Sequence, residues 1–550
     1  MTRDTANICV LAACLALTAC GGHSAAAGST ASTGGTGSTG SSGSGVIVFG
    51  TDVLTYHNDA MRTGQDLTEA LLTPQNVNAT SFGKLRLLPA DGLVDAAPLI
   101  VSGISLGGVK RNVVYIASEH DSVYAYDADS GEPLLHTSLL GSGESSSDAR
   151  GCSQVAPEIG ITATPVIDRS AGPNGTLFVV AMSRDASGNY HQRLHALDLQ
   201  TLADRLPATT IQASAPGNGP DSVGGSLQFD PKQYKERAAL LLVNGQIYLA
   251  FASHCDIPPY NGWIMSYVEA TLAQSAVLQL TPNGSEGAIW DVGGLAADGA
   301  GNLYATVANG TFDTTLDAQG MPDAQDYGNA ALRLTATGAS LTIADYFTPA
   351  NTAAESANDV DLGAGSVVLL MDQTDNAGTM HHLMTVGGKD ANLYVLDRDH
   401  LGHFNSSSNA IYQQISLGGG LFCAPVYFNG RVYVGDVGGT LQAFSFANAQ
   451  LPATASSQSA QTFAYPGTSP AISAQGSANA ILWALESAPG SAAVLHAYNP
   501  ANLGEEYYNS AQAGASRDSF GNGNKFITPV IANGKVFIGT PNGVAVFGLL

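Results

Sequence analysis

The sequence predicts an all-β fold, an eight-bladed β-propeller, from three observations. A short unit recurs in which a glycine-permitted turn leads into an apolar strand that stops at an aspartate, most clearly from Gly387 to Arg398. Charged residues make up only 12% of the chain, whereas it has 64 glycines and is 44% hydrophobic. Asn-Gly pairs at 244–245, 429–430 and 533–534 separate apolar runs, which is among the strongest hairpin signals. Many short strands joined by turns in a repeated unit are typical of propellers.

Eight copies of the repeated unit follow one another, and each begins with a strand entered through a proline or a small residue. Their second strands are expected at residues 113–117, 177–181, 247–252, 303–307, 382–386, 432–435, 481–485 and 536–539. The fourth and fifth copies are the least regular. Seven blades is therefore the alternative count.

The last copy has only three strands before the chain ends at Leu550. The run from Lys84 to Leu88 lies before the first copy and supplies the missing outer strand in our interpretation. Pairing the two ends of the domain closes the ring and leaves no free sheet edge. The propeller is thus expected over residues 84–550, after a polar segment at 47–83 in which a short helix is expected near Thr68.

The first residues have the pattern of a targeting segment. A short apolar run from Ile8 to Ala16 is followed by Leu17-Thr18-Ala19-Cys20, which resembles a bacterial lipobox. We expect a signal peptide at 1–19, a lipid on Cys20 and a flexible Gly/Ser linker over 20–46. The protein is then an exported, membrane-anchored lipoprotein of the outer membrane, on its periplasmic or surface face. An uncleaved anchor or a secreted form without lipid is the alternative.

Charge and cysteine content narrow the choice of partners and compartment. A formal net charge of −24 argues against nucleic-acid phosphates as a partner. The mature domain keeps Cys152, Cys255 and Cys423. An oxidising compartment favours one disulfide, and the polar contexts of Cys152 and Cys255 favour that pair, with Cys423 as a buried thiol.

At Lys389–Arg398 the chain resembles the segment of quinoprotein alcohol dehydrogenases in which a Lys or Arg faces pyrroloquinoline quinone (PQQ). The repeats resemble PQQ-type propeller repeats over nearly all of residues 84–550. The runs at 56–59, 157–161 and 309–313 resemble those of a group of uncharacterised bacterial PQQ-repeat lipoproteins.

This resemblance implies a site for PQQ and calcium. Calcium prefers carboxylate and amide oxygens, an indole gives a flat stacking floor, and a carboxylate can remove an alcohol proton. The residues carried over are Trp290 as the floor, Asp256 and Asn309 as calcium ligands, Asp359 or Asp361 as the catalytic carboxylate, and Lys389 as the catalytic and cofactor-binding cation.

Three departures from the dehydrogenases count against catalysis. Their vicinal cysteine pair is represented only by Cys152, Glu158 stands where they have an arginine, and no Cys-x-x-Cys-His haem motif occurs. A carboxylate beside an anionic cofactor is costly. We therefore expect a non-catalytic binding or scaffold platform at the cell envelope, with envelope proteins or glycans as partners. A PQQ/calcium-dependent dehydrogenase of an alcohol or sugar and a carbohydrate-binding propeller are the alternatives.

Overall fold

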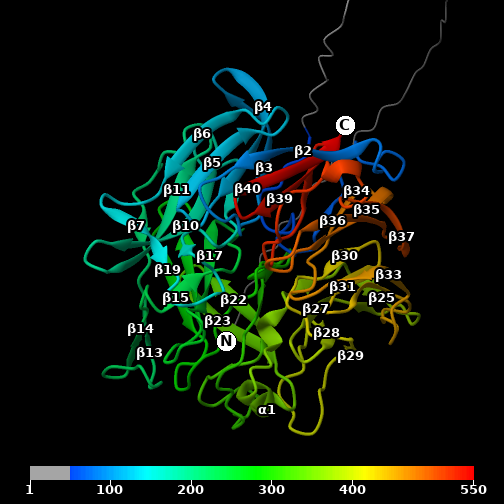
Figure 1. Ribbon diagram of the computed structural model, residues 1–550. Helices are drawn as coiled ribbons and strands as arrows, with labels where there is room; N and C mark the ends of the chain where they lie inside the picture. The colour runs from blue at the N-terminus through cyan, green and yellow to red at the C-terminus, as the bar shows by residue number, and fades with distance from the viewer. Residues whose placement is uncertain (1–49) are drawn as a thin grey trace, which may run out of the picture. The chain divides into compact units, whose positions relative to one another are not determined.

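The computed structural model describes residues 50–550, and their regular structure is almost entirely β-strand. The expected signal peptide, the lipid on Cys20 and the Gly/Ser linker lie outside the described residues. Among the residues that are described, no helix has the length and apolar character needed to cross a membrane. Figure 1 shows the strands grouped into sheets around a common centre, in chain order from blue to red.

Eight antiparallel sheets form the blades, which confirms the eight-bladed propeller. Blade one has β3 (Leu99–Leu106), β4 (Val109–Ala117), β5 (Ser122–Asp127) and β6 (Pro133–Ser138). Blade two has β9 (Val166–Asp168), β10 (Thr176–Asp185), β11 (Tyr190–Asp198) and β12 (Thr209–Thr210). Blade three has β16 (Leu241–Val243), β17 (Gln246–Ser253), β18 (Trp263–Val268) and β19 (Gln274–Gln279). Blade four has β20 (Ala296–Ala297), β21 (Leu303–Thr306), β22 (Ala331–Thr337) and β23 (Ser340–Phe347).

The second half of the ring continues the pattern. Blade five has β24 (Val368–Leu369), β27 (Leu383–Gly387), β28 (Asn392–Asp397) and β29 (Gln413–Ser416). Blade six has β30 (Val426–Phe428), β31 (Arg431–Gly435), β32 (Thr440–Ser445) and β33 (Ser457–Thr462). Blade seven has β34 (Ala471–Gln475), β35 (Ala478–Glu486), β36 (Val494–Asn499) and β37 (Asn502–Asn509). Blade eight has β38 (Val530–Ala532), β39 (Lys535–Thr540) and β40 (Gly543–Leu549).

The strand β2 (Phe82–Pro89) completes blade eight by pairing antiparallel with β40, with Phe82 opposite Leu549 and Pro89 opposite Gly543. The expected closure of the ring by the N-terminal strand is thus confirmed. Phe82 also contacts Trp483 and Tyr508 of blade seven, with ring centroids 5.5 and 5.0 Å apart. Large aromatic side chains between neighbouring blades supply much of the apolar burial that holds them face to face.

The remaining elements are short additions to the blades. They are β1 (Gln65–Asp66), β7 (Glu144–Asp148), β8 (Glu158–Ile159), β13 (Ser214–Pro216), β14 (Ser226–Gln228), β15 (Tyr234–Glu236), β25 (Gln373–Thr374), β26 (Met380–His381), α1 (Thr352–Ala357) and the 3₁₀ turns η1 (Leu362–Ala364) and η2 (Gly514–Ser516). Blades four and five looked irregular in the sequence because their inner strands, β20 and β24, have only two residues each.

Residues 51–69, which we call the axial segment, run along the inner strands instead of forming the helix expected near Thr68. The backbone of this segment bonds to blades one, two, four, five, six and seven, through the pairs Val53–Ile100, Leu54–Ile167, Ala60–Ala297, Met61–Leu369, Thr63–Tyr427 and Gly64–Ile472. Thr51 N–H donates to the Asn533 side chain in blade eight. The segment therefore caps the exposed inner edges that an open ring of sheets would leave unpaired.

Arg62 fixes the axial segment to the third and fourth blades. Its guanidinium is fully buried and donates to the carbonyls of Leu240 (3.1 Å), Leu295 (3.0 Å) and Tyr56 (3.0 Å). Every buried polar group needs such partners, so a polar sequence can occupy the centre of the ring. Residues 51–69 belong to the segment that the sequence marked as polar, and their polar groups help to join them to all eight blades.

Candidate functional site

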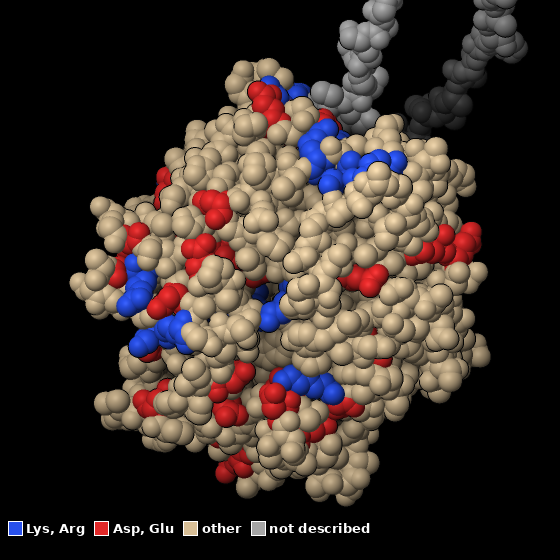
Figure 2. Space-filling model, viewed as in Figure 1, with Lys and Arg blue, Asp and Glu red and all other residues tan. Residues whose placement is uncertain are grey.

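Loops that precede the innermost strands, together with turns that follow the second strands β17 and β27, meet around the ring axis and form a cavity of about 130 Å³. Figure 2 shows the viewed face hollowed near its middle, with basic side chains inside the hollow. The residues lining the cavity are Gln154, Arg237, Ser253, Asp256, Trp290, Asp359, Asp361, Lys389, Phe422, Tyr465, Lys525 and Phe526. Five of the six residues carried over from the dehydrogenases are in this set. Asn309 is not in it.

Asp361 is the centre of a hydrogen-bond network on one wall of the cavity. One carboxylate oxygen accepts the Trp290 indole N–H (3.2 Å) and contacts the Lys389 ammonium (2.7 Å). The other accepts the backbone N–H of Asn309 (2.7 Å), so the main chain of Asn309, not its carboxamide, makes this contact. The side chain of Asp361 is 2% exposed. Asp361 therefore fixes the indole, the lysine and the Asn309 loop together.

Lys389 lies in the turn between β27 and β28, where the sequence placed it. Its ammonium also contacts Asp359 at 2.9 Å, and the side chain of Asp359 is 70% exposed. Burial acts to lower the pKa of Lys389, but the two carboxylates outweigh burial and raise the pKa above its ordinary value. Lys389 is thus a paired cation rather than a free one.

Four aromatic rings follow one another around the cavity in the order Trp290, Phe422, Tyr465 and Phe526. Their centroids are 6.1, 5.3 and 6.1 Å apart, and Phe526 returns to Trp290 at 6.2 Å. Tilted and edge-on pairs at such distances are favourable arrangements of aromatic quadrupoles. The rings come from the loops that enter blades four, six, seven and eight, so these blades jointly build an apolar girdle.

The sequence analysis did not find this girdle, although a positional signal exists. Phe422 and Phe526 each stand three residues before the proline that opens the inner strand of the blade. The same position holds Asp95 in blade one and Thr162 in blade two, and both line an adjoining cavity of about 20 Å³. In these four blades the repeat therefore places this position at the axis, and comparing it between blades would have found Phe422 and Phe526.

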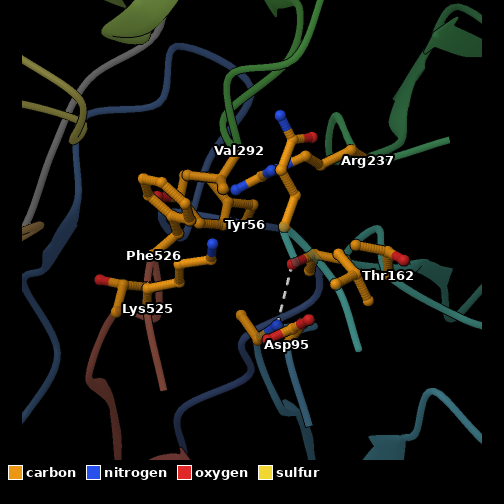
Figure 3. Close-up of a pocket in the computed structure, with 12 residues that line it drawn as sticks. Tyr56, Asp95, Thr162, Arg237, Val292, Lys525 and Phe526 are labelled. Carbon is orange, nitrogen blue, oxygen red and sulfur yellow. Dashed lines mark hydrogen bonds between the residues drawn. The ribbon is translucent and has the colours of Figure 1, made fainter. Parts of the chain in front are cut away.

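The adjoining cavity, shown in Figure 3, is lined by Tyr56 of the axial segment and shares Arg237 and Lys525 with the larger one. Arg237 lies between β15 and β16 and is 6% exposed. Its guanidinium carbon is 4.4 Å from the centroid of Phe526 and 5.6 Å from that of Trp290. No hydrogen bond or ion pair joins it to any residue between 50 and 550. Burial lowers the pKa of Arg237 from its ordinary value.

Two lysines accompany Arg237. Lys525 donates to the Ser153 carbonyl at 3.4 Å, and burial together with the nearby Arg237 charge lowers its pKa. Lys235 is buried and donates to Gln154 at 3.3 Å; burial and Arg237 lower its pKa to about 7. Like charges held together out of water disfavour one another. Arg237 therefore has two basic neighbours at the axis.

The carboxylate of Glu158, expected to oppose an anionic cofactor, points elsewhere. It contacts the His120 imidazole at 2.9 Å and does not line the axial cavity. A disulfide joins Cys152 to Cys255, with their Cα atoms 5.9 Å apart. Gln154 and Asp256, close to the two cysteines in the chain, lie at the cavity. Cys423 is a buried free thiol whose Sγ contacts the Pro466 carbonyl at 3.1 Å.

A second polar cluster lies away from the axis, where Asp345, His400 and His403 have ligand atoms within 4.8 Å of one another. Asp345 already accepts the backbone N–H of Leu401 at 2.9 Å and contacts His403 at 3.0 Å and Arg333 at 3.7 Å. These donors satisfy the Asp345 carboxylate, and the positive charge of Arg333 disfavours the binding of a metal cation beside it. The cluster therefore anchors the loop at 400–403 to blade four.

The residues at the axis do not fit PQQ and calcium in this arrangement. Calcium requires six to eight oxygen ligands, but Asp361 is engaged by three donors and the Asn309 carboxamide is off the cavity. The cations of Arg237 and Lys389 lie over the Trp290 indole, at 5.6 and 5.7 Å, where a stacked quinone would need an open face. A cavity of about 130 Å³ is also below the roughly 300–1,000 Å³ typical of larger ligands.

Comparison with solved structures shows that the fold is a β-propeller like that of quinohemoprotein alcohol dehydrogenases. The quinohemoprotein alcohol dehydrogenase of Comamonas testosteroni superposes with a TM-score of 0.59 at 13% identity, over 90% of this chain and 80% of that one. The enzyme ADHIIG of Pseudomonas putida HK5 gives 0.56 at 14% identity with the same coverage. BamB of Moraxella catarrhalis is also similar, at 0.45 and 11% identity, over 85% of this chain and all of BamB. No protein-family model and no curated protein matches the chain.

Proposed function

We propose that this protein is a non-catalytic binding propeller of the cell envelope, with its ligand site in the axial cavity. The observation that carries the proposal is Arg237, a buried guanidinium that has no hydrogen-bond or ion-pair partner among the described residues and faces a cavity built by the loops of many blades. Leaving such a charge unpaired is costly, and folded proteins tolerate the cost mainly at functional sites. The blade loops around the site serve as the platform for envelope proteins or glycans.

Export and anchoring are part of the same proposal. The Cys152–Cys255 disulfide is of the kind that persists in oxidising compartments and supports a location outside the cytoplasm. A lipid on Cys20 would place the propeller at a membrane surface. Labelling with a radioactive fatty acid tests this directly: Cys20→Ala should remove the label and release the protein from the membrane fraction, and unchanged fractionation would contradict anchoring at this residue.

The decisive test of the proposed function is reconstitution with PQQ and calcium. A binding propeller of this kind gains no quinone absorbance and does not reduce an artificial electron acceptor with alcohols or sugars. Stoichiometric quinone and turnover, both lost in Trp290→Ala, would replace the proposal with a dehydrogenase. The clustering of Trp290, Asp361 and Lys389 in one cavity is the observation that makes a PQQ/calcium-dependent dehydrogenase the second candidate.

Cross-linking in intact cells tests the platform. We expect envelope proteins to be recovered with the propeller, and binding on a glycan array would instead favour a carbohydrate partner. If cross-linking recovers the protein alone and the glycan array shows no binding, the proposed platform is contradicted. The ligand site in the axial cavity is tested separately, by titration.

A further inference from the structure

We infer that the axial cavity binds a small organic anion with one aromatic ring and one carboxylate, and that Arg237 holds the carboxylate. The inference rests on the proposed function and names the chemical class of its ligand. It depends on three features of the described residues: the free guanidinium, the second cation Lys525 that lines the same cavities, and the girdle of four aromatic rings.

The free guanidinium indicates where the anion binds. Arg237 is 6% exposed, yet no hydrogen bond or ion pair joins it to any residue in the described part of the chain. It lines both axial cavities. Figure 3 shows its guanidinium and the Lys525 side chain reaching into the same space beside Phe526. Because the guanidinium is a planar fork of N–H donors, its best-matched partner is a carboxylate held by two parallel hydrogen bonds.

A second cation beside Arg237 indicates that the ligand is an anion. Lys525 lines both axial cavities together with Arg237. The carboxylates that act on Arg237 are Asp95, Glu119 and Asp291, and none of them forms an ion pair with it among the described residues. A ligand carboxylate can therefore bind between the guanidinium and the ammonium group.

The girdle indicates that the rest of the ligand is a flat ring. Phe526 and Trp290 flank the guanidinium, and Tyr465 is 44% exposed at the cavity opening. Aromatic groups offer both faces and edges to another ring and contribute about 0.5–1.5 kcal/mol per pair beyond burial. The space of about 130 Å³ is close to the roughly 150 Å³ of a cavity that binds benzene, which fits a single ring.

Titration calorimetry with benzoate as the probe tests the inference on the full-length protein. We expect saturable binding to the wild type and a loss of affinity of at least about 30-fold in Arg237→Gln. Arg398→Gln is the matched control, because Arg398 is also buried, at 8% exposed, but already donates to the Leu383 carbonyl at 3.2 Å and lies away from the axial cavity. It should bind benzoate like the wild type. No binding by the wild type, or equal binding by Arg237→Gln, overturns the inference.

A stability measurement separates a ligand site from a structural role. Without ligand, Arg237→Gln should melt at a higher temperature than the wild type, because the change removes an unpaired buried charge. Benzoate should raise the melting temperature of the wild type and leave that of Arg237→Gln unchanged. A variant that melts lower than the wild type would show that Arg237 is held by protein partners, and it would overturn the inference.

Three further titrations define the class and separate this inference from the proposed function. Benzamide lacks the charge and inorganic phosphate lacks the ring, so either one binding as tightly as benzoate contradicts the ligand class. PQQ with calcium is titrated in parallel. Calcium-dependent quinone binding overturns the proposed function, whereas absence of both quinone and benzoate binding overturns only the inference.

Discussion

Replacing Asp361 with asparagine should destabilise the protein far more than the same change at Asp359, although both carboxylates contact one lysine. Asp361→Asn leaves the Lys389 ammonium without its buried partner and weakens the acceptor of the Trp290 indole and the Asn309 N–H. Breaking a buried ion pair costs about 3–5 kcal/mol, and the oxygen that asparagine retains places the expected loss near about 3 kcal/mol. Asp359 is 70% exposed, so Asp359→Asn should cost about 0–1 kcal/mol.

Equilibrium unfolding in guanidinium chloride, followed by tryptophan fluorescence and by circular dichroism, measures the two losses. The midpoint shift converts to a free energy if the slope is unchanged between variants. Trp290 is a useful local reporter, since the other tryptophans, Trp263 and Trp483, are fully buried. Its emission should change in Asp361→Asn and not in Asp359→Asn. Equal losses in the two variants would refute the assignment of Asp361 as the buried centre of the network.

Three further changes test other parts of the structure. Burial lowers the pKa of His57 in the axial segment to about 3, so the folded protein keeps it neutral while the unfolded chain binds a proton below about pH 6.5. Stability should therefore fall by up to about 1.4 kcal/mol per pH unit between pH 6.5 and 3, and His57→Gln should flatten this acid limb in pH-dependent unfolding. Burial lowers the pKa of Lys235 to about 7, so between about pH 7 and 10.5 the unfolded chain binds more protons than the folded protein. The free energy of unfolding should therefore rise with pH in that window. Lys235→Met should remove the rise, and a rise that persists in this variant would contradict a buried lysine. Cys152→Ser opens a cross-link that spans 103 residues and should cost about 2–5 kcal/mol in denaturant unfolding, and the wild type under reducing conditions should lose the same amount. Identical midpoints for oxidised and reduced protein would contradict that cross-link.

The repeat made most of the fold predictable. Asn-Gly turns at positions such as Asn429-Gly430 and prolines before inner strands act locally, so they mark hairpins and strand starts without knowledge of tertiary contacts. The pairing of β2 with β40 could be inferred because an incomplete last blade needs an outer strand. Blades four and five were the hardest to recognise, because their inner strands, β20 and β24, have only two residues each.

The axial segment could not be predicted, because its structure depends on contacts made after the ring has formed. Its polar residues resemble those of a surface loop, and only the closed ring supplies partners such as the Leu240 and Leu295 carbonyls for Arg62. The resemblance to quinoprotein dehydrogenases correctly indicated that Trp290, Asp361 and Lys389 lie in one site. It gave no indication of Arg237, because nothing local in the run from Lys235 to Arg237 shows that the guanidinium is buried without an ion-pair partner among residues 50–550.

Native mass spectrometry of the protein purified from its own cells tests the central claim most directly, because it weighs whatever the axial cavity holds. The account predicts a wild-type population carrying one small organic acid, which is absent from Arg237→Gln purified in the same way. A bound quinone with calcium, or the same bound mass in the wild type and Arg237→Gln, would contradict it.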